Sequence, residues 1–219
     1  MAAFIKIKGD NNVYSLMAHN QRSRTVLSNP DIDHNRSDKN IDIIERVEKR
    51  GMSDYSYYKK RLSEIYQYGK ERKDLVKALG FVSHVPKDLP PEQQKKFFAY
   101  TYMFLCEKFG RENICQAVIH LEEATPHLHA VILPVTALDE SKKFDQKQLE
   151  KGYTEKLNAA GVINRQMLRD FHPEYREFLR NRGIDANVNS GITREQGGNR
   201  TVAQLKAERN RDVDIDRWR

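Results

Sequence analysis

The sequence predicts an α+β fold in which four or five antiparallel strands alternate with helices. Short runs rich in β-branched residues predict four of the strands, at residues 3–8, 75–85, 114–120 and 128–135. Stretches with apolar residues at helical spacing lie between and after these runs. The connection EEATP between the last two runs is short, so these strands are expected to pair as an antiparallel hairpin.

The N-terminal region begins with a strand and a short helix. Residues 3–8 alternate between apolar and polar and end at the turn-forming sequence GDNN. Residues 13–21 carry apolar side chains on one helical face. This helix places His19 and Arg22 one turn apart, because residues three apart lie on the same side of a helix.

A polar loop and a second helix follow. Residues 23–39 are polar and rich in turn formers, which predicts a surface loop, and residues 40–44 fit a short edge strand. Ser53 is a good N-cap, and apolar side chains recur at helical spacing from there to about residue 68. Gly69 is expected to end this helix.

The middle of the chain contains the clearest helix. Gly80 lies inside the strand expected at 75–85, and a glycine within a strand is typical of a bulge. Pro90 and Pro91 open a helix that is expected to run to residue 109 and to stop at Gly110.

The C-terminal region is predicted as two helices followed by an arm. The helices are expected at residues 147–160 and 164–182. A polar, glycine-bearing stretch then predicts a linker from Gly183 to about residue 200, and a charged helix ends the chain. We therefore expect one domain at 1–182 and an arm, the start of a C-terminal extension, at 183–219.

Composition excludes several classes of protein. No run of about 18 apolar residues is present to span a membrane, and the N-terminus lacks the apolar core of a secretory signal. Cys106 and Cys115 are too few for a disulfide framework, so a reducing, cytoplasmic location is expected. The formal net charge of +7 is a mild indication of a polyanionic partner.

Three histidines lie within ten residues, in the string HLEEATPHLH. His127 and His129 are two apart on a predicted strand, so their side chains share one face of the sheet. The hairpin brings His120 opposite them. Three imidazoles with open positions remaining suit a divalent metal that also holds a substrate, and Mn, Zn, Co or Ni all fit these ligands.

Nearby carboxylates have two interpretations. Glu123 is three residues after His120 and is expected to orient a ligand or to attract the metal. Glu122 fits that role about as well as it fits a solvated turn. The isolated His34, His84 and His172 are interpreted as ordinary polar residues.

These residues also carry a resemblance. A histidine–hydrophobic–histidine strand is the signature of the HUH endonucleases, and the pattern H-x-x-E-x-T-P-H-x-H resembles the Mob/Pre family of plasmid mobilisation proteins, the MobV-type relaxases. The family's H-N-x-R motif is matched at His19–Arg22, and weaker matches occur in the same order along the chain. They lie at 40–43, 72–74 and 201–206.

The resemblance implies an HUH fold, with a central antiparallel sheet of about five strands flanked by helices, and a relaxase activity. Such an enzyme nicks one strand of plasmid DNA at an origin of transfer, stays attached to the 5′-phosphate and later religates the ends. His19 is then the nucleophile, Arg72 contacts the scissile phosphate, and Arg22 and Glu123 support catalysis. The metal ligands are His120, His127 and His129, with manganese the favoured ion and Mg, Zn, Co or Ni also compatible.

The resemblance further implies where the protein acts and with what. The expected partner is the single-stranded and hairpin DNA of the origin, in the cytoplasm of a plasmid-bearing bacterium. A homodimer is expected through a C-terminal region beyond this chain. Two family positions differ here: an arginine is replaced by Gly69, with Lys70 or Arg22 as substitutes, and an acidic residue by Gly80.

The chemistry fits these residue types, although tyrosine is a rival nucleophile. An imidazole with an ordinary pKa of about 6.5 is mostly neutral at pH 7, whereas a phenol near 10 needs more activation. Tyr14 lies five residues before His19, and the pair Tyr57 and Tyr58 resembles that of rolling-circle replication initiators. A DNA-binding regulator with a structural metal and a metal-dependent hydrolase of small molecules also remain open.

Contacts to DNA require basic and aromatic surface. The basic candidates beyond those already named are Arg24, Lys59, Lys60, Arg61, Lys70, Lys73, Arg194 and Arg200. Phe81 and Tyr153 are the candidates for stacking on bases.

Overall fold

The fold is given by a computed structural model, which describes residues 2–23, 39–44, 51–68, 74–123 and 125–188. The chain divides into two units, Met1–Asn189 and Ser190–Arg219, and the second lies outside the described residues. The expected domain at 1–182 and arm at 183–219 therefore stay a prediction.

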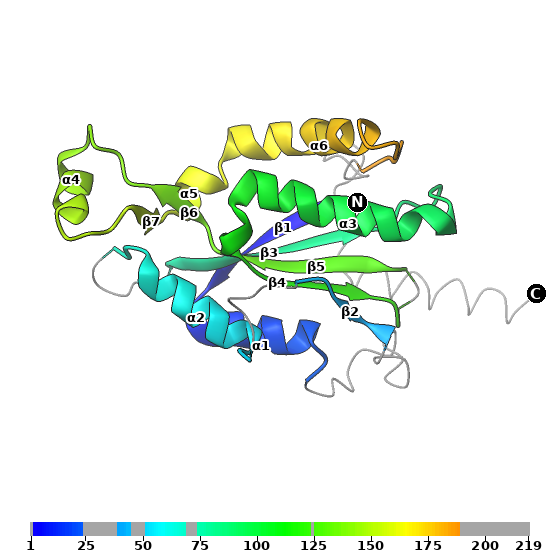
Figure 1. The fold of residues 1–219 in the computed structure, drawn as a ribbon, viewed down its shortest axis with the longest axis horizontal. Helices are drawn as coiled ribbons and strands as arrows, with labels where there is room; N and C mark the ends of the chain where they lie inside the picture. The colour runs from blue at the N-terminus through cyan, green and yellow to red at the C-terminus, as the bar shows by residue number, and fades with distance from the viewer. Residues whose placement is uncertain (1, 24–38, 45–50, 69–73, 124, 189–219) are drawn as a thin grey trace, which may run out of the picture. The chain divides into compact units, whose positions relative to one another are not determined.

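A five-stranded antiparallel sheet is the centre of the fold, which confirms the α+β class (Figure 1). The strand order is β1-β3-β5-β4-β2, and β4 and β5 form the expected hairpin. The strands are β1 (Ala2–Lys8), β2 (Ile41–Asp42), β3 (Val76–His84), β4 (Ile114–His120) and β5 (His127–Ile132).

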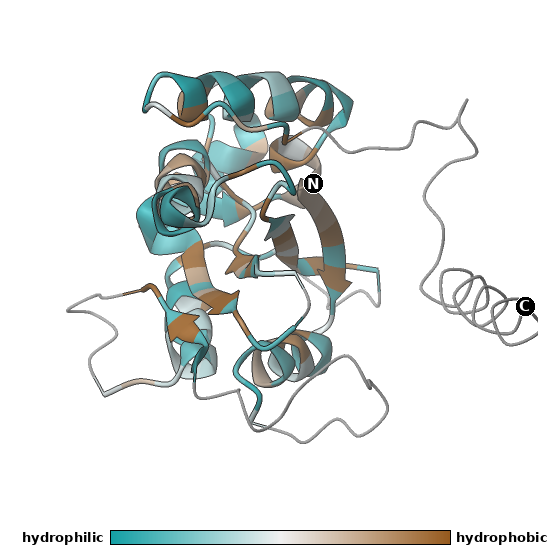
Figure 2. Ribbon diagram, turned by 90° about the vertical axis from the view of Figure 1, so that its right-hand side faces the viewer, coloured by the Kyte–Doolittle hydropathy of each residue, from teal (hydrophilic) through white to brown (hydrophobic). Residues whose placement is uncertain are grey.

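Helices cover both faces of this sheet (Figure 1). One face carries α3 (Pro91–Phe109) and α6 (Arg165–Arg180), and the other carries α1 (Asp10–Asn20) and α2 (Asp54–Glu64). In Figure 2 the strands are mostly hydrophobic, and the flanking helices carry hydrophilic residues on their outer sides. The sheet is therefore buried from two directions, and burial of its apolar side chains is the main stabilising term.

Alternation along β5 divides its side chains between two hydrophobic clusters. Leu128, Ala130 and Ile132 pack with the aromatic side chains of α3 and α6. Val131 packs with α1 and α2 on the other face, which is also the face of His127 and His129. The helices α1 and α2 thus cover one end of this face, and the histidines lie at its other end.

Capping residues set the ends of several helices. Ser53 is the N-cap of α2, as expected, because its Oγ accepts a 3.1 Å hydrogen bond from the Ser56 amide. Pro91 begins α3, and Gly110, with φ of +83°, follows its last turn. Asn164 caps α6 in the same way through the Met167 amide, at 2.9 Å.

The prediction of a single helix at 147–160 was wrong. The segment contains α4 (Lys143–Leu149), β7 (Glu155–Leu157) and α5 (Ala159–Val162). Gly152, with φ of +89°, turns the chain after α4, and β7 then pairs with β6 (Val135–Ala137). The strand expected at 128–135 accordingly ends at Ile132, and Pro134 separates it from β6.

Gly80 does not mark a bulge. It pairs regularly with Ile5, and the irregularity in β3 falls opposite Ile7 and Lys8 instead. A Cβ at position 80 would lie 2.8 Å from Ile5 Cγ1 and 3.2 Å from Leu16 Cδ2. The glycine is explained by the close approach of these two side chains rather than by backbone shape.

The first residues after α6 pack into the core. Ile184, Ala186 and Val188 are buried in the same cluster as α3 and α6, although a linker is expected from Gly183. Alternate apolar residues in an otherwise polar stretch are the signal for this packing.

Candidate active site

The three histidines of the string HLEEATPHLH converge on one face of the sheet. His120 in β4 is directly opposite His127 in β5, and His129 lies two residues further along β5. Neighbouring ring centroids are 4.6 to 5.1 Å apart. One nitrogen from each ring lies within 4.8 Å of those of the other two, which is a spacing that a single metal ion can bridge.

Hydrogen bonds fix the tautomers of two of these rings. His127 donates from Nδ1 to the Thr125 carbonyl at 2.8 Å, so its Nε2 carries the lone pair. His120 donates from Nε2 to the Asn20 carbonyl at 2.7 Å, so its Nδ1 carries the lone pair. Backbone carbonyls that hold the second nitrogen are typical partners of metal-binding histidines, so the donor set fits a divalent metal.

Burial also keeps the rings neutral. Loss of hydration, followed by the charge of Arg22, lowers the pKa of His120 to about 4, although the bond to Asn20 opposes this. Burial beside two other imidazoles lowers the pKa of His129 to about 2. A neutral imidazole is the form that binds a metal, so burial keeps both rings in that form at pH 7.

His19 approaches this cluster from the last turn of α1. Partial burial and the nearby charge of Arg22 lower its pKa, so the ring is neutral at pH 7. Nη1 of Arg22 lies 3.1 Å from His19 Nε2. Because a guanidinium only donates hydrogen bonds, Nε2 is the acceptor and carries the lone pair.

Arg22 joins the helix end to the loop after β4. Its backbone has φ of +54°, a left-handed conformation that few non-glycine residues adopt, and its side chain is only 5% exposed. Nε donates to Glu122 at 2.7 Å, and Nη2 lies 2.5 Å from Glu123 and 3.0 Å from His120 Nδ1. Glu122 is therefore a buried ion-pair partner rather than a solvated turn carboxylate.

Residues that the sequence interpretation missed hold this arrangement in place. The Asn20 side chain donates to Gln116 at 2.8 Å, which ties the end of α1 to β4. Asn40 accepts a 3.0 Å hydrogen bond from the Leu121 amide and so fixes the start of the loop that carries the two glutamates. The motif match at 40–43 was a signal for Asn40, but nothing in the local pattern marks Gln116.

His84 is a fourth histidine beside the cluster. It pairs with His127 across β3 and β5, and the two ring centroids are 5.0 Å apart. The interpretation of His84 as an isolated polar residue overlooked this contact, because only the strand register reveals it.

Several predicted residues fall elsewhere or outside the described part of the chain. Arg61 is not a surface contact, because it is buried and pairs with Glu155 at 2.5 Å, and Phe81 is buried in the core rather than free to stack on a base. Lys59 is exposed and pairs with Asp10 at 2.7 Å. The residues outside the described ranges are Arg24, His34, Gly69, Lys70, Arg72, Lys73, Arg194 and Arg200.

The rival tyrosines differ in exposure. Tyr57 and Tyr58 are buried and donate to the Glu112 carbonyl and to Asp10, respectively. Burial, together with the Asp10 charge, raises the pKa of Tyr58 far above its usual value, which makes it a poor nucleophile. Tyr14 is 43% exposed and packs edge-on against Tyr55.

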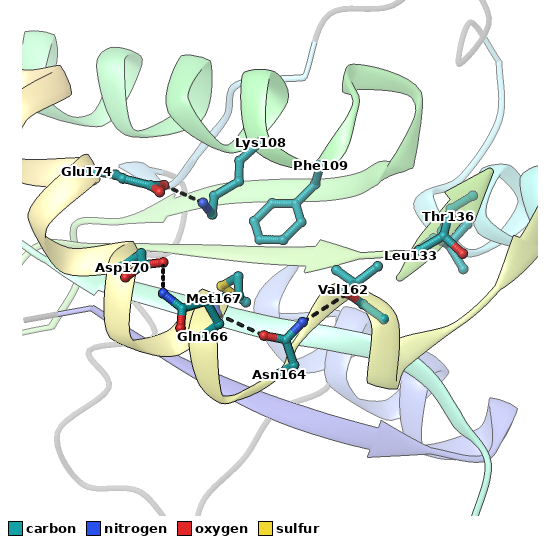
Figure 3. Close-up of a pocket in the computed structure, with 12 residues that line it drawn as sticks. Lys108, Phe109, Leu133, Thr136, Val162, Asn164, Gln166, Met167, Asp170 and Glu174 are labelled. Atoms are coloured by element: carbon teal, nitrogen blue, oxygen red, sulfur yellow. Dashed lines mark hydrogen bonds and ion pairs between the residues drawn. The ribbon is translucent and has the colours of Figure 1, made fainter. Parts of the chain in front are cut away.

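A separate pocket lies on the α3 and α6 side of the sheet (Figure 3). It has a volume of about 460 Å³ and is lined by apolar residues such as Phe109 and Met167 and by the ion pair of Lys108 with Glu174. None of the histidines in the described ranges lines it. Across the described ranges, no helix is long and apolar enough to span a membrane.

Comparison with known proteins gives a consistent result. Plasmid recombination enzymes from a Bacillus species and from Lactiplantibacillus plantarum are 33% and 30% identical to this chain. The matches cover 76% and 95% of this chain but only 37% and 53% of the relatives, so the chain spans about half of their length or less.

Solved structures share the fold. The relaxase domain of MobM, in an Mn-bound crystal structure with plasmid pMV158 oriT DNA, superposes with a TM-score of 0.70 at 24% identity. The superposition covers 95% of this chain and 97% of the MobM chain. Residues 1–207 match the family model Mob_Pre, which is described as plasmid recombination enzyme. The chain therefore belongs to the Mob_Pre family of plasmid recombination enzymes.

Proposed function

We propose that this chain is the nicking domain of a plasmid relaxase. It cuts one DNA strand at an origin of transfer, keeps the 5′-phosphate as a covalent adduct of His19, and religates the ends during conjugative mobilisation. The observation that carries this proposal is the position of a neutral His19, with the lone pair on Nε2, beside Arg22 and a cluster of three histidines.

His120, His127 and His129 would hold a divalent ion, which would supply charge neutralisation at the scissile phosphate and polarise its phosphorus. The lone pairs on His120 Nδ1 and His127 Nε2 support these residues as ligands. Manganese is the favoured ion, since the MobM relaxase domain crystallised in a Mn-bound form.

His19 supplies the nucleophile. Its Nε2 lone pair forms a bond to phosphorus while the bond from phosphorus to the 3′-oxygen breaks, and the released oxygen takes a proton to become a 3′-OH. The ring gives up its Nδ1 proton to solvent, which balances the proton taken by the 3′-oxygen, so the product is a phosphoramidate. The adduct retains an activated phosphorus, so attack by a 3′-OH reverses the step and rejoins the strand.

Cationic residues are proposed to position the DNA. Arg22 lies within the site and offers guanidinium donors suited to phosphate oxygens, with Glu123 fixing its orientation. Arg72 is proposed as a second phosphate contact, and further basic residues are proposed to contact the strand. These are Arg24, Lys70, Lys73, Arg194 and Arg200.

The proposed partner is single-stranded and hairpin DNA of the origin, bound in the cytoplasm of a plasmid-bearing bacterium. A homodimer also remains part of the proposal. A tyrosine-using replication initiator is the second candidate, and only the exposure of Tyr14 favours it, because Tyr57 and Tyr58 are buried.

The direct test uses supercoiled plasmid carrying the cognate origin, with and without Mn²⁺. The proposal predicts relaxed plasmid with protein attached after denaturation, only when Mn²⁺ is present. His19→Ala is expected to abolish the adduct, and Tyr14→Phe is expected to retain it. Failure to form any adduct on supercoiled or single-stranded origin DNA would overturn the proposal.

A further inference from the structure

One guanidinium occupies the centre of the site. Among the described residues, four side chains with lone pairs surround Arg22: Glu122 at 2.7 Å, Glu123 at 2.5 Å, His120 Nδ1 at 3.0 Å and His19 Nε2 at 3.1 Å. Only 5% of the Arg22 side chain is exposed, so little water reaches the guanidinium. Arg22 therefore balances the negative charge of both carboxylates in a poorly hydrated place.

The contact with His120 conflicts with metal binding. Because Nε2 of His120 donates to the Asn20 carbonyl, Nδ1 is the nitrogen left for a metal. That nitrogen has one lone pair, and it accepts from Arg22 Nη2 at 3.0 Å. A metal ion and Arg22 therefore cannot both use His120 Nδ1.

The backbone of Arg22 directs the side chain into this position. Its φ of +54° follows the end of α1 directly and turns the side chain back over the last turn. Nη1 also donates to the carbonyl of His19 at 3.2 Å, which holds the guanidinium against the helix end. The same guanidinium thus engages the two lone pairs that the proposed reaction requires, those of His19 and His120.

We propose that Arg22 is an internal competitor of the metal ion. In the metal-free protein its guanidinium is the cation of the site, and it holds both the nucleophile and one ligand inactive. Metal binding displaces Nη2 from His120 and, with it, Nη1 from His19, while Nε keeps its bond to Glu122. The freed donors of Arg22 then face the position of the scissile phosphate. This inference rests on the proposed use of the three histidines as metal ligands.

The competition predicts that removing the guanidinium tightens metal binding. In Arg22→Gln the lone pair of His120 Nδ1 is released, and two nearby carboxylates lose their cation. Both changes favour a divalent ion, so the Kd for Mn²⁺ is expected to fall by at least about tenfold. A purely structural role for Arg22 predicts the reverse, because the ligands would lose their support.

Arg61 offers a matched control. It is also a largely buried arginine, paired with Glu155 at 2.5 Å and Asn113 at 3.1 Å, and its hydrogen bonds and ion pairs within the described part of the chain involve neither the histidines nor their loop. Arg61→Gln is therefore expected to lower Tm to a similar extent while leaving the Kd for Mn²⁺ unchanged.

The experiment is calorimetric titration of metal-stripped protein with MnCl₂, with Tm recorded before and after loading. Tighter Mn²⁺ binding by Arg22→Gln, with a larger rise in Tm on loading than in the wild type, supports the inference. Equal or weaker binding by a folded Arg22→Gln protein overturns it. If even the wild type binds no Mn²⁺, the proposed metal-dependent function fails, which is a different outcome.

A second measurement avoids the variant, in case Arg22→Gln does not fold. Guanidinium Nη hydrogens held by several acceptors give protected signals in the NMR spectrum of the wild type. Addition of diamagnetic Zn²⁺ is expected to remove the Nη protection of Arg22 and to leave that of Arg61. Retention of both sets of signals in the loaded protein overturns the inference.

Discussion

The backbone carbonyl of Asn20, at the end of α1, accepts a 2.7 Å hydrogen bond from Nε2 of His120, at the end of β4. This bond fixes the tautomer of a proposed metal ligand and ties it to the helix turn that carries His19. The positions are 100 residues apart in the sequence, so the H-N-x-R motif and the histidine string form one structural unit.

The first prediction concerns Asn20, whose buried side chain donates to Gln116. Asn20→Ala leaves a buried acceptor unpaired, so the free energy of unfolding is expected to fall by about 1–3 kcal/mol. Because the turn that orients His120 also loosens, Mn²⁺ affinity is expected to fall by about 10-fold or more. Urea unfolding and calorimetric titration measure the two effects, and unchanged Mn²⁺ affinity would refute the orienting role.

The second prediction concerns the proposed metal ligands. His127→Ala and His129→Ala each remove a proposed ligand. Loss of a residue that only orients a ligand typically weakens metal binding by about 10–100-fold, so each of these changes is expected to weaken Mn²⁺ binding by more than that. Nicking is expected to be lost in parallel. The matched control is His172→Ala, on α6 at the other face of the sheet, which should bind Mn²⁺ normally. Nicking that survives without Mn²⁺ binding would contradict the role of the metal.

The third prediction concerns acid stability of the metal-free protein. Folding lowers the pKa of His120 from 6.5 to about 4 and that of His129 from 6.5 to about 2. The unfolded chain therefore binds more protons below pH 6.5, so stability must fall as the pH falls from 6.5 towards 4. The slope is expected to reach up to about 1.4 kcal/mol per pH unit for each group.

Urea unfolding at a series of pH values tests this expectation. His129→Gln removes one titrating group, so its slope over the same range should be smaller. A wild-type stability that stays constant between pH 6.5 and 4 would show that these rings are not neutral in the folded protein.

The fourth prediction concerns Gly80. An added Cβ would lie 2.8 Å from Ile5 Cγ1, so Gly80→Ala is expected to destabilise the protein by about 1–3 kcal/mol through overpacking. Gly80→Glu, which introduces the acidic residue typical of the family, is expected to cost more. Shortening Ile5 to Ala, which removes Cγ1, should recover part of the loss in Gly80→Ala, and thermal unfolding of the single and double variants measures this. Full stability of Gly80→Ala would exclude the packing explanation.

Local patterns predicted most of the strands and helices. Alternation and β-branching located β1, β3, β4 and β5, and capping residues located the starts of α2 and α3. The helix expected at 147–160 failed because the turn at Gly152 and the pairing of β7 with β6 outweighed helical spacing.

The site was only partly predictable, because several of its contacts join residues that are far apart in the sequence. The cluster of three histidines could be predicted from the sequence, because the two-residue period of a strand places their side chains on one face of the sheet. The burial of Glu122, the proximity of His84 and the contacts of Arg22 depend on register and on contacts across about a hundred residues. Such contacts leave no periodic trace in the sequence.

The central claim is that His19, rather than a tyrosine, carries the DNA. Tryptic digestion of the adduct yields the peptide 9–22, which contains both Tyr14 and His19, so fragment-ion mass spectrometry must place the nucleotide on one of them. We expect a nucleotide on His19, held through a bond that acid cleaves and alkali does not. An acid-stable nucleotide on Tyr14, or an adduct that persists in His19→Ala, would contradict it.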